Sequence, residues 1–227
     1  MKRLDVLQRI KGGLIVSCQA LKTEPLYSSY IMARLAYAAK EGGAVGIRAN
    51  TPEDILEIKK SVDLPIIGLY KMEYGDSDVY ITPTMSEIDA LMEVKPDIIA
   101  LDATNRIRPN GETIETFFKK VREKYPDMIF MADCSTYEEG IRAEELGMDI
   151  ISTTLCGYTK ETEGIDIPSF SMIERLAKDL TIPLVAEGGI WAPNQLHQVF
   201  ECGAYAAVVG TAITRPREIT KRFVLAI

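Results

Sequence analysis

The clearest sign of the architecture lies in residues 184–210, which read LVAEGGIWAPNQLHQVFECGAYAAVVG. Two short apolar runs, residues 184–187 and 206–210, stand at the two ends, and a longer segment rich in polar residues joins them. A short, nearly continuous apolar run is typical of a parallel strand that is buried on both faces. This stretch therefore predicts a strand, a helix and a second, parallel strand.

The same alternation continues along the whole chain of 227 residues. We expect strands at residues 14–19, 44–48, 65–70, 98–102, 129–133, 150–154, 184–187 and 206–210. The segments between them carry helix-start signals, such as Thr51-Pro52 and the capping-box pair Thr136 and Glu139. Alternating strands and helices predict an α/β protein with a parallel sheet.

Eight such units at this length favour closure into a (β/α)8 barrel, also called a TIM barrel. We expect residues 1–227 to form a single domain, because no Gly/Ser-rich linker or shift in composition interrupts them. The alternative is a doubly wound open sheet. That fold usually has fewer strands and a glycine-rich first turn, whereas residues 17–20 read SCQA.

The composition restricts the classes of partner. Lys and Arg number 26 and Asp and Glu number 33, which gives a formal net charge of −7. This balance argues against nucleic acid or an anionic membrane surface, because either would require a basic face. Four widely spaced cysteines suggest neither a zinc site nor a disulfide framework. With no signal peptide or membrane-spanning segment in the sequence, we expect a cytoplasmic protein.

Polar or small residues follow the apolar runs, at the point where each strand is expected to end. In a TIM barrel these ends gather at one mouth, where the chemistry takes place. In chain order they are Gln19, Arg48, Lys71, Asp102, Asp133, Thr153 with Thr154, Glu187, and Gly210 with Thr211. A purely structural barrel has little reason to collect such a set of charges at one end.

Lys71 and Glu187 end the third and seventh runs, and these strands lie opposite each other in a ring of eight. A base and an acid on opposite faces of one carbon can invert a stereocentre. Lysine needs burial or nearby cations to act as a base at neutral pH, and Arg48 could supply part of that effect. The alternatives are a solvent-exposed Lys71 and a Glu187 that forms a structural ion pair with Arg48 or Arg215.

Asp102 and Asp133 end neighbouring strands and are expected to hold sugar hydroxyls or to orient Lys71, Asp133 more than Asp102. A metal site is the least favoured reading, because the only histidine, His197, lies in a predicted helix. Glycines and a threonine follow the last two strands, and Arg215 opens the final helix. This is where many TIM barrels bind phosphate. The expected phosphate-binding residues are Gly188, Gly189, Gly210 and Thr211.

The connection after the third strand, which includes residues 74–84, is longer than a usual loop at this position. We interpret it either as a lid over the mouth or as an ordinary solvated loop.

Several stretches, in order along nearly the whole chain, resemble the N-acetylmannosamine-6-phosphate 2-epimerase family. They are GLIVSCQAL at 13–21, GIRAN at 46–50, ALDAT at 100–104, TTLCGY at 153–158, GTAITRP at 210–216 and EITKRF at 218–223. The resemblance implies a barrel, commonly dimeric, that interconverts the 6-phosphates of N-acetylmannosamine and N-acetylglucosamine without a metal or other cofactor. This reaction belongs to sialic acid and amino sugar breakdown.

The resemblance also implies residue roles. Lys71 and Glu187 match the proton-transfer pair, and Gln19, Arg48, Asp133 and Arg215 match positions that bind substrate or support the chemistry. Thr153 is a further candidate for substrate binding. The sequence departs from the family at two positions. Met72 stands where an arginine often follows the lysine, and Gly189 supplies no side chain to the site.

Two other functions remain open at this point. Lys71 could form a Schiff base with a phosphorylated sugar in an aldol cleavage. Alternatively, the barrel could bind a phosphosugar without converting it, although that function would not explain an opposed lysine and glutamate. The fold itself does not distinguish these functions, because TIM barrels support many chemistries.

Overall fold

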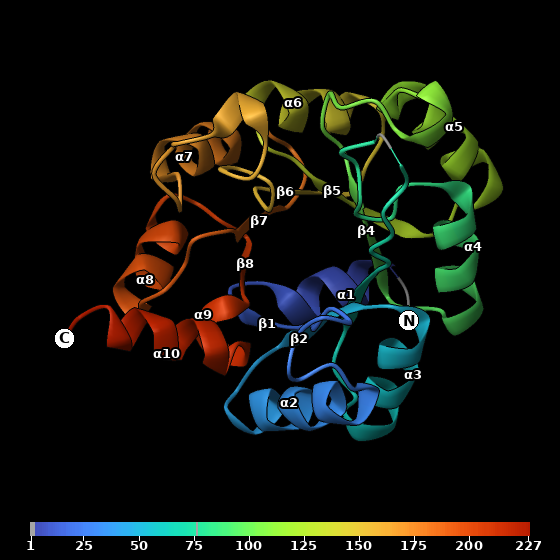
Figure 1. Ribbon diagram of the computed structural model, residues 1–227. Helices are drawn as coiled ribbons and strands as arrows, with labels where there is room; N and C mark the ends of the chain where they lie inside the picture. Colours follow the sequence, from blue (N-terminus) through green and yellow to red (C-terminus); the bar gives the residue numbers. More distant parts are fainter. Residues whose placement is uncertain (1–2, 76) are drawn as a thin grey trace.

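The computed structural model describes residues 3–75 and 77–227. Eight parallel strands form a closed barrel in the order β1 to β8, with β1 paired to β8. Figure 1 shows the strands as an inner ring with helices around it. The strands are β1 (Leu14–Cys18), β2 (Gly46–Asn50), β3 (Ile66–Leu69), β4 (Ile98–Asp102), β5 (Ile129–Asp133), β6 (Ile150–Ser152), β7 (Leu184–Glu187) and β8 (Ala206–Val209). The predicted (β/α)8 fold is confirmed.

A layer of helices covers the outside of the strands. It consists of α2 (Ser29–Glu41), α3 (Pro52–Ser61), α4 (Met85–Val94), α5 (Ile114–Lys124), α6 (Tyr137–Glu145), α7 (Phe170–Asp179) and α8 (Pro193–Glu201). Two short 3₁₀ helices, η1 (Pro109–Gly111) and η2 (Lys160–Thr162), lie in loops. The remaining helices are α1 (Arg3–Ile10), α9 (Thr211–Thr214) and α10 (Pro216–Val224). No helix in the described ranges combines the length and the apolar character needed to cross a membrane.

The predicted helix starts are confirmed by their hydrogen bonds. The Thr51 side chain accepts from the backbone N–H of Asp54 at the start of α3. At the start of α6, Thr136 and Glu139 form the reciprocal capping box, so two otherwise unpaired backbone donors are satisfied. These caps set where each helix begins, and therefore how long the preceding βα loop is.

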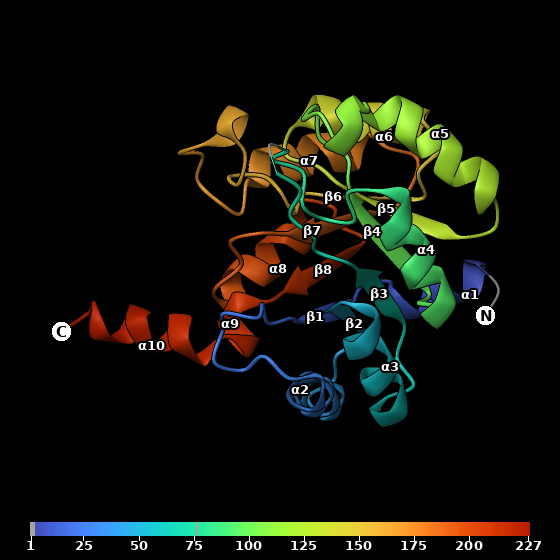
Figure 2. The ribbon, with the colours of Figure 1, turned by 45° about the vertical axis from the view of Figure 1, so that its right-hand side comes forward.

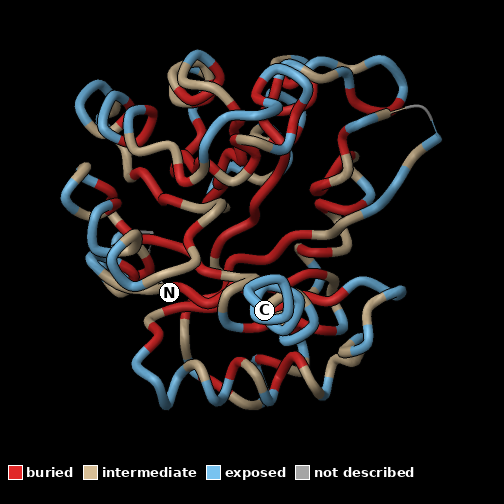
Figure 3. Tube along the Cα trace, turned by 60° about the vertical axis from the view of Figure 1, so that its left-hand side comes forward, coloured by how far each residue is buried: buried red, intermediate tan, exposed pale blue. Residues whose placement is uncertain are grey.

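Two apolar cores hold the barrel together. One fills the space between strands and outer helices, and the other fills the barrel interior. Figure 3 shows the buried strands inside a more exposed periphery. Helix α1 closes the amino-terminal end of the interior, where Val6 and Ile10 pack with Ile15. Ile81 and Leu155 belong to the same interior core and also line the cavity at the other end.

Helix α10 differs from the helices that cover the barrel in how little of it is buried. None of the residues of α10 is buried. Figure 2 shows it extending sideways, away from the barrel, to the carboxyl terminus. A helix that buries nothing gains little stability from tertiary packing, so its apolar residues remain available to another surface.

Candidate active site

A cavity of about 650 Å³ opens at the carboxyl ends of the strands. Most of the predicted site residues line it, namely Gln19, Arg48, Lys71, Glu187, Gly188, Gly189, Gly210, Thr211 and Arg215. Residues up to 196 positions apart in the sequence therefore meet at one mouth, as the strand-end pattern predicts. A cavity of this size is within the usual range for small-molecule sites.

Arg48 on β2 forms the centre of a buried charge network. Its two terminal nitrogens lie 3.0 Å and 2.5 Å from the two carboxylate oxygens of Asp133. The nitrogen nearer Oδ1 also lies 2.8 Å from Oε2 of Glu187. Burial alone would lower the pKa of Arg48, but Asp133 and Glu187 outweigh it and raise the pKa. Arg48 is therefore a permanent cation at the floor of the cavity.

Thr154 connects the two carboxylates of this network. Its hydroxyl lies 2.7 Å from Oδ1 of Asp133 and 3.1 Å from Oε2 of Glu187. The neighbouring Thr153 points elsewhere, because its hydroxyl donates to the Glu187 carbonyl and accepts from the Glu187 N–H. Thr154 lines the cavity, whereas Thr153 and Asp133 do not. These last two residues hold Glu187 and Arg48 in place from below.

Lys71 lies two residues beyond the end of β3 and faces this network. Burial lowers the pKa of its ammonium group to about 8; Arg48 and Arg215 add to that effect, whereas Glu187 and Asp133 oppose it. Its Nζ makes no hydrogen bond or ion pair with any residue in the described ranges. A lysine with such a pKa is partly neutral near pH 7, which proton abstraction requires.

Glu187 ends β7, on the opposite side of the ring from Lys71. Burial raises the pKa of its carboxyl group to about 7; Arg48 and Lys71 oppose the shift, and Asp133 adds to it. Titratable groups with strongly shifted pKa values are typical of functional sites. The predicted opposition of Lys71 and Glu187 across one mouth is therefore present, with pKa values that suit proton exchange near neutrality.

The glycine loops after β7 and β8 form the other wall of the cavity. Gly188 and Gly189 have φ values of 101° and 72°, in the left-handed region that glycine adopts most easily. A Cβ atom on Gly189 would lie 2.6 Å from the backbone of Ile167, so a side chain would not fit there. The backbone N–H groups of Gly188, Gly189 and Thr211 have no acceptor among the described residues. Unpaired donors in a glycine loop suit an anionic ligand.

Arg215 lies between α9 and α10 at the rim of the cavity. Its guanidinium group lies 3.3 Å from Oε2 of Glu24, which comes from the loop after β1. Arg217 lies 3.5 Å from the other oxygen of the same carboxylate. Glu24 therefore fixes Arg215 beside the glycine loops while leaving it partly exposed.

Comparisons with known proteins agree with this geometry. The family described as "Putative N-acetylmannosamine-6-phosphate epimerase" matches residues 32–227. The chain belongs to this N-acetylmannosamine-6-phosphate epimerase family. A relative from Caldanaerobacter subterraneus subsp. tengcongensis, named "Putative N-acetylmannosamine-6-phosphate 2-epimerase", is 55% identical over 222 residues. The match covers 98% of this chain and 94% of that protein.

Solved structures extend the comparison. The N-acetylmannosamine-6-phosphate 2-epimerase from Clostridium perfringens has a TM-score of 0.92 and 51% identity, and the match covers 97% of this chain and 96% of that one. Thiamine phosphate pyrophosphorylase from Pyrococcus furiosus has a TM-score of 0.60 but only 19% identity, with 95% and 98% covered. The second likeness shows the barrel fold alone.

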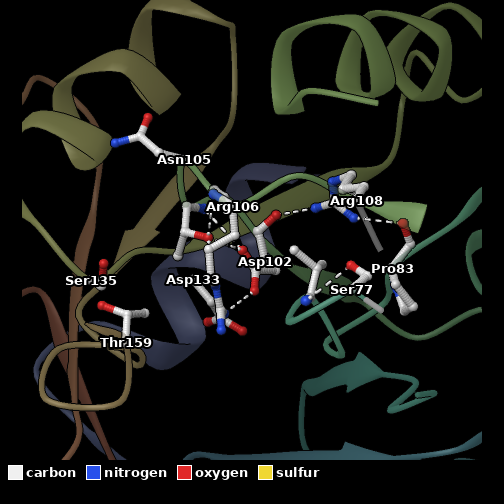
Figure 4. Close-up of polar contacts among 12 residues, drawn as sticks. Ser77, Pro83, Asp102, Asn105, Arg106, Arg108, Asp133, Ser135 and Thr159 are labelled. Carbon is white, nitrogen blue, oxygen red and sulfur yellow. Dashed lines mark hydrogen bonds and ion pairs between the residues drawn. The ribbon is translucent and has the colours of Figure 1, made fainter. Parts of the chain in front are cut away.

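In this epimerase-family barrel, the strand-end pattern predicted that Asp102 would face the cavity, and the structure places its side chain elsewhere. It does not line the cavity, and its carboxylate pairs with Arg106 at 2.5 Å and accepts from Thr104. Figure 4 shows Asp102 among Arg106 and Arg108, whose side chains come from the loop after β4. That loop turns back over Asp102 and occupies its carboxylate.

Other predictions about single residues can be placed on the structure. His197 on α8 is exposed and lies 3.4 Å from Glu201, so it is a surface residue. No group of three His, Cys, Asp or Glu side chains suited to a metal ion occurs in residues 3–75 and 77–227. In the loop after β3, Asp76 lies outside the described residues, while Tyr80 and Ile81 line the cavity. That loop therefore supplies part of the wall.

Sequence reasoning missed several residues that this family member brings to the cavity. Tyr80, Tyr158 and Trp191 line it, and so do Lys221 and Arg222 from α10. The Arg222 guanidinium lies 4.6 Å from the centre of the Trp191 ring, a cation–π contact at the rim. A single aromatic residue in a loop gives no signal in the sequence, so only the folded chain reveals this group.

Proposed function

We propose that this protein is an isomerase that interconverts N-acetylmannosamine-6-phosphate and N-acetylglucosamine-6-phosphate by moving a proton at C2, in sialic acid and amino sugar breakdown. Family membership and the printed names of the relatives support the substrate pair. The observation that carries the chemistry is the pair of half-buried groups, Lys71 after β3 and Glu187 on β7, on opposite sides of one mouth with pKa values of about 8 and about 7.

The proposed reaction begins with opening of the sugar ring, which exposes the C1 aldehyde and acidifies the C2 proton. Neutral Lys71 removes that proton, and the electron pair of the C–H bond moves into an enolate whose oxygen becomes negative. The permanent cation Arg48 stabilises this charge. Protonated Glu187 returns a proton to C2 from the opposite face, and the two groups exchange roles in the reverse direction.

The rest of the cavity would bind the substrate. The N–H groups of Gly188, Gly189, Gly210 and Thr211, with Arg215, suit the 6-phosphate. Gln19 lines the same wall, and its side-chain oxygen has no hydrogen-bond partner among the described residues, so it suits a sugar hydroxyl. In this proposal Asp133 and Thr153 act by holding Arg48 and Glu187. No metal or other cofactor is assigned a step.

Incubation with N-acetylmannosamine-6-phosphate in D2O without added metal, followed by NMR at C2, tests the activity. We expect N-acetylglucosamine-6-phosphate with deuterium at C2. Binding without conversion would instead support the phosphosugar-binding function. Cleavage to smaller fragments, with a covalent adduct after borohydride reduction, would support the Schiff-base aldolase.

A second experiment tests the two-group mechanism. Substrate that carries deuterium at C2 is converted in H2O in a single turnover, and the product is analysed by mass spectrometry. Transfer between two different groups should give product with solvent hydrogen at C2. Retention of deuterium in the product would show that one group removes and returns the same hydrogen, and would remove Glu187 from its proposed role.

The proposed assembly is a homodimer. Helix α10 and the residues after it expose Phe223 and Leu225, which retain 74% and 88% of their accessible surface, together with Val224 and Ile227. Clustered apolar side chains on a helix that buries none of its residues suit a protein contact. We expect twice the chain mass of 25.2 kDa by light scattering, and a shift toward the monomer in Phe223→Asp with Leu225→Asp.

The proposed location is the cytoplasm. The four cysteines are free thiols, and Cys18, Cys134 and Cys156 are buried, which suits a reducing compartment. Fractionation of cells that express the tagged protein would test this location, and recovery in the membrane or secreted fraction would contradict it.

A further inference from the structure

Lys71 is held by a small antiparallel pairing rather than by β3 itself. Lys71 forms a bridge with Ile81, the Met72 N–H donates to the Tyr80 carbonyl at 3.0 Å, and the Thr82 N–H donates to the Tyr70 carbonyl at 2.9 Å. The segment that pairs with Lys71 is thus residues 80–82, at the far end of the loop that Lys71 begins. The position of Lys71 therefore depends on how firmly residues 80–82 are fixed.

Thr82 anchors that far end. It is completely buried, and its φ of 47° is unusual for a β-branched residue, so the surroundings must hold it there. Its hydroxyl accepts from the Tyr70 N–H at 3.1 Å and donates to the Ala100 carbonyl at 2.7 Å. One side chain therefore joins Tyr70, the residue between β3 and Lys71, to the neighbouring strand β4.

Arg108 holds the same turn from the other side. It is only 2% exposed, and it donates to the carbonyls of Thr82 at 3.1 Å and Pro83 at 2.8 Å, and to that of Asp102. Figure 4 shows Arg108 between Pro83 and Asp102, with a dashed line to each. Its guanidinium group lies 4.1 Å from the centre of the Phe117 ring. Among the described residues it forms no ion pair, so its donors serve backbone carbonyls.

A second contact ties the two loops together farther out. The Ser77 hydroxyl donates to the Ile107 carbonyl at 2.9 Å and accepts from the Val79 N–H at 3.2 Å. The loop after β4 thus contacts the loop after β3 at both its tip and its base. These contacts immobilise the wall that carries Tyr80 and Ile81.

We propose that Thr82 and Arg108 form a clasp that positions Lys71 for proton transfer and keeps water away from it. The inference rests on the proposed function, because it takes Lys71 as the base. Thr82 and Arg108 are positioning residues, since neither lines the cavity. The backbone N–H of Lys71 donates to Asn50 Oδ1 at 2.8 Å, whereas its Nζ has no hydrogen-bond or ion-pair partner in residues 3–75 and 77–227, so the fixed main chain sets where the side chain starts.

Variants that weaken the clasp should change two quantities, the pKa of Lys71 and the turnover rate. Lys71 faces Arg48 from β2, Asp133 from β5, Glu187 from β7 and Arg215 from the segment before α10. Displacing it from this setting and admitting water would raise its pKa toward the ordinary value for lysine. A displacement of about 1 Å can lower turnover by about 100-fold while binding of the phosphate is unchanged.

The decisive variant is Thr82→Val, which keeps the branched shape and removes both hydrogen bonds of the hydroxyl. We expect kcat to fall by about 10- to 100-fold with KM within about twofold of wild type. The alkaline shift of the Lys71 titration should be about one pH unit. Thr82→Ser keeps the hydroxyl and should restore kcat. Arg108→Lys keeps the charge but loses the forked donor geometry, and should give the same signature at smaller size.

Arg122 provides a matched control at the other end of the barrel. It donates to the carbonyls of Met128 and Gly147 at 2.7 Å and 2.9 Å, and its guanidinium group lies 5.2 Å from the centre of the Phe118 ring. Arg122→Lys should lower the melting temperature at least as much as Arg108→Lys, because Arg122 also pairs with Asp149 at 2.8 Å. It should leave kcat, KM and the pH profile unchanged, because Met128, Gly147 and Asp149, to which Arg122 donates, precede β5 and β6 at the opposite end of the barrel.

The Lys71 titration is also followed by NMR of ¹³Cε-labelled lysine in the free protein, with Lys71→Arg to assign the signal. This readout does not depend on turnover, so it separates failure of the clasp from failure of the proposed function. A raised Lys71 pKa in Thr82→Val but not in Thr82→Ser or Arg122→Lys would support the clasp. Folded Thr82→Val with wild-type kcat and pKa, or with losses matched by Arg122→Lys, would overturn it.

Discussion

The two ends of the barrel are built from the same strands but are closed in opposite ways. At the amino-terminal end, α1 inserts Val6 and Ile10 into an apolar interior. At the carboxyl end, Arg48, Asp133 and Glu187 form a buried charge network around an open cavity. Apolar closure contributes stability, whereas buried charges are expensive to desolvate and contribute little net stability. The difference indicates that the carboxyl end is built for chemistry.

The two ends of the barrel also differ in how completely their buried polar atoms are hydrogen-bonded. Near the amino end, the Asp149 carboxylate accepts from Arg122 and from the Phe130 N–H, both at 2.8 Å. At the mouth, Nε of Arg48 and Oε1 of Gln19 are buried without a partner in the described part of the chain. Unsatisfied buried polar atoms are rare in folded proteins, so these two atoms are suited to a ligand.

Removing the proposed base should have the largest effect of any change at the mouth. Lys71→Ala should lower kcat by at least about 10³-fold, because it removes the group that takes the C2 proton in the proposed mechanism. Binding of the phosphosugar, measured by calorimetry, should stay within a few-fold of wild type. Turnover close to wild type in this variant would show that Lys71 is not the base.

Replacing the opposing acid should have the next largest effect. Glu187→Gln keeps the size of the side chain and should lower kcat by about 100-fold in both directions of the reaction. Arg48 then loses one of its two carboxylates but keeps Asp133, so the fold should persist. Circular dichroism checks the fold, and an unchanged kcat would reduce Glu187 to a structural partner of Arg48.

The pH dependence of kcat/KM should be bell-shaped. The neutral form of Lys71 grows as pH rises toward its pKa of about 8, and the protonated form of Glu187 declines as pH rises above its pKa of about 7. The product of the two populations is largest near pH 7.5, at about the midpoint, and falls about tenfold per unit beyond either limb. Glu187→Gln should abolish the alkaline decline; if it persists, another group titrates there.

A smaller effect is expected at the rim. Arg215→Ala should raise KM for the phosphorylated sugar by about tenfold and change kcat little, because a partly exposed charge pair with phosphate adds about 1–2 kcal/mol of binding. Arg217→Ala is the control, since Arg217 shares Glu24 but does not line the cavity. An equal rise of KM in both variants would mean that Arg215 attracts the phosphate only through its general positive charge and does not contact it directly.

The smallest effect on activity should come from the amino-terminal end. Ile10→Ala should lower the free energy of unfolding by about 2–4 kcal/mol, because it leaves a cavity in the interior core. Below the melting temperature, kcat and KM should match wild type. A clear loss of activity in the folded variant would show that the two ends of the barrel are coupled, contrary to the division described above.

The sequence predicted the ring of strands well because each strand is buried on both faces and reads as an apolar run. The run at residues 98–102 coincides with β4, whereas the run at 44–48 begins two residues before β2. The strand ends predicted Lys71 and Glu187 as opposed groups, since ring position follows from strand order. Helix α1 was not predicted, because four polar residues interrupt its four apolar residues in a segment that reads as charged and mixed.

The features that could not be predicted depend on loops. Asp102 and Asp133 stand side by side in the register of β4 and β5, yet only Asp133 contacts Arg48. The return of Arg106 over Asp102 is set by loop conformation, which leaves no periodic signal. The same holds for Tyr80 and for Arg108, which reach their places only once the two loops pack together.

The apolar filling of the barrel restricts how substrate enters the site and how product leaves it. Because α1 and the interior side chains fill the axis up to Ile81 and Leu155, a sugar phosphate that enters the mouth cannot depart along the axis. Both epimers must then enter and leave through the same mouth, and each competes with the other for it. A molecule bound at this opening would therefore block the entry and release of both epimers.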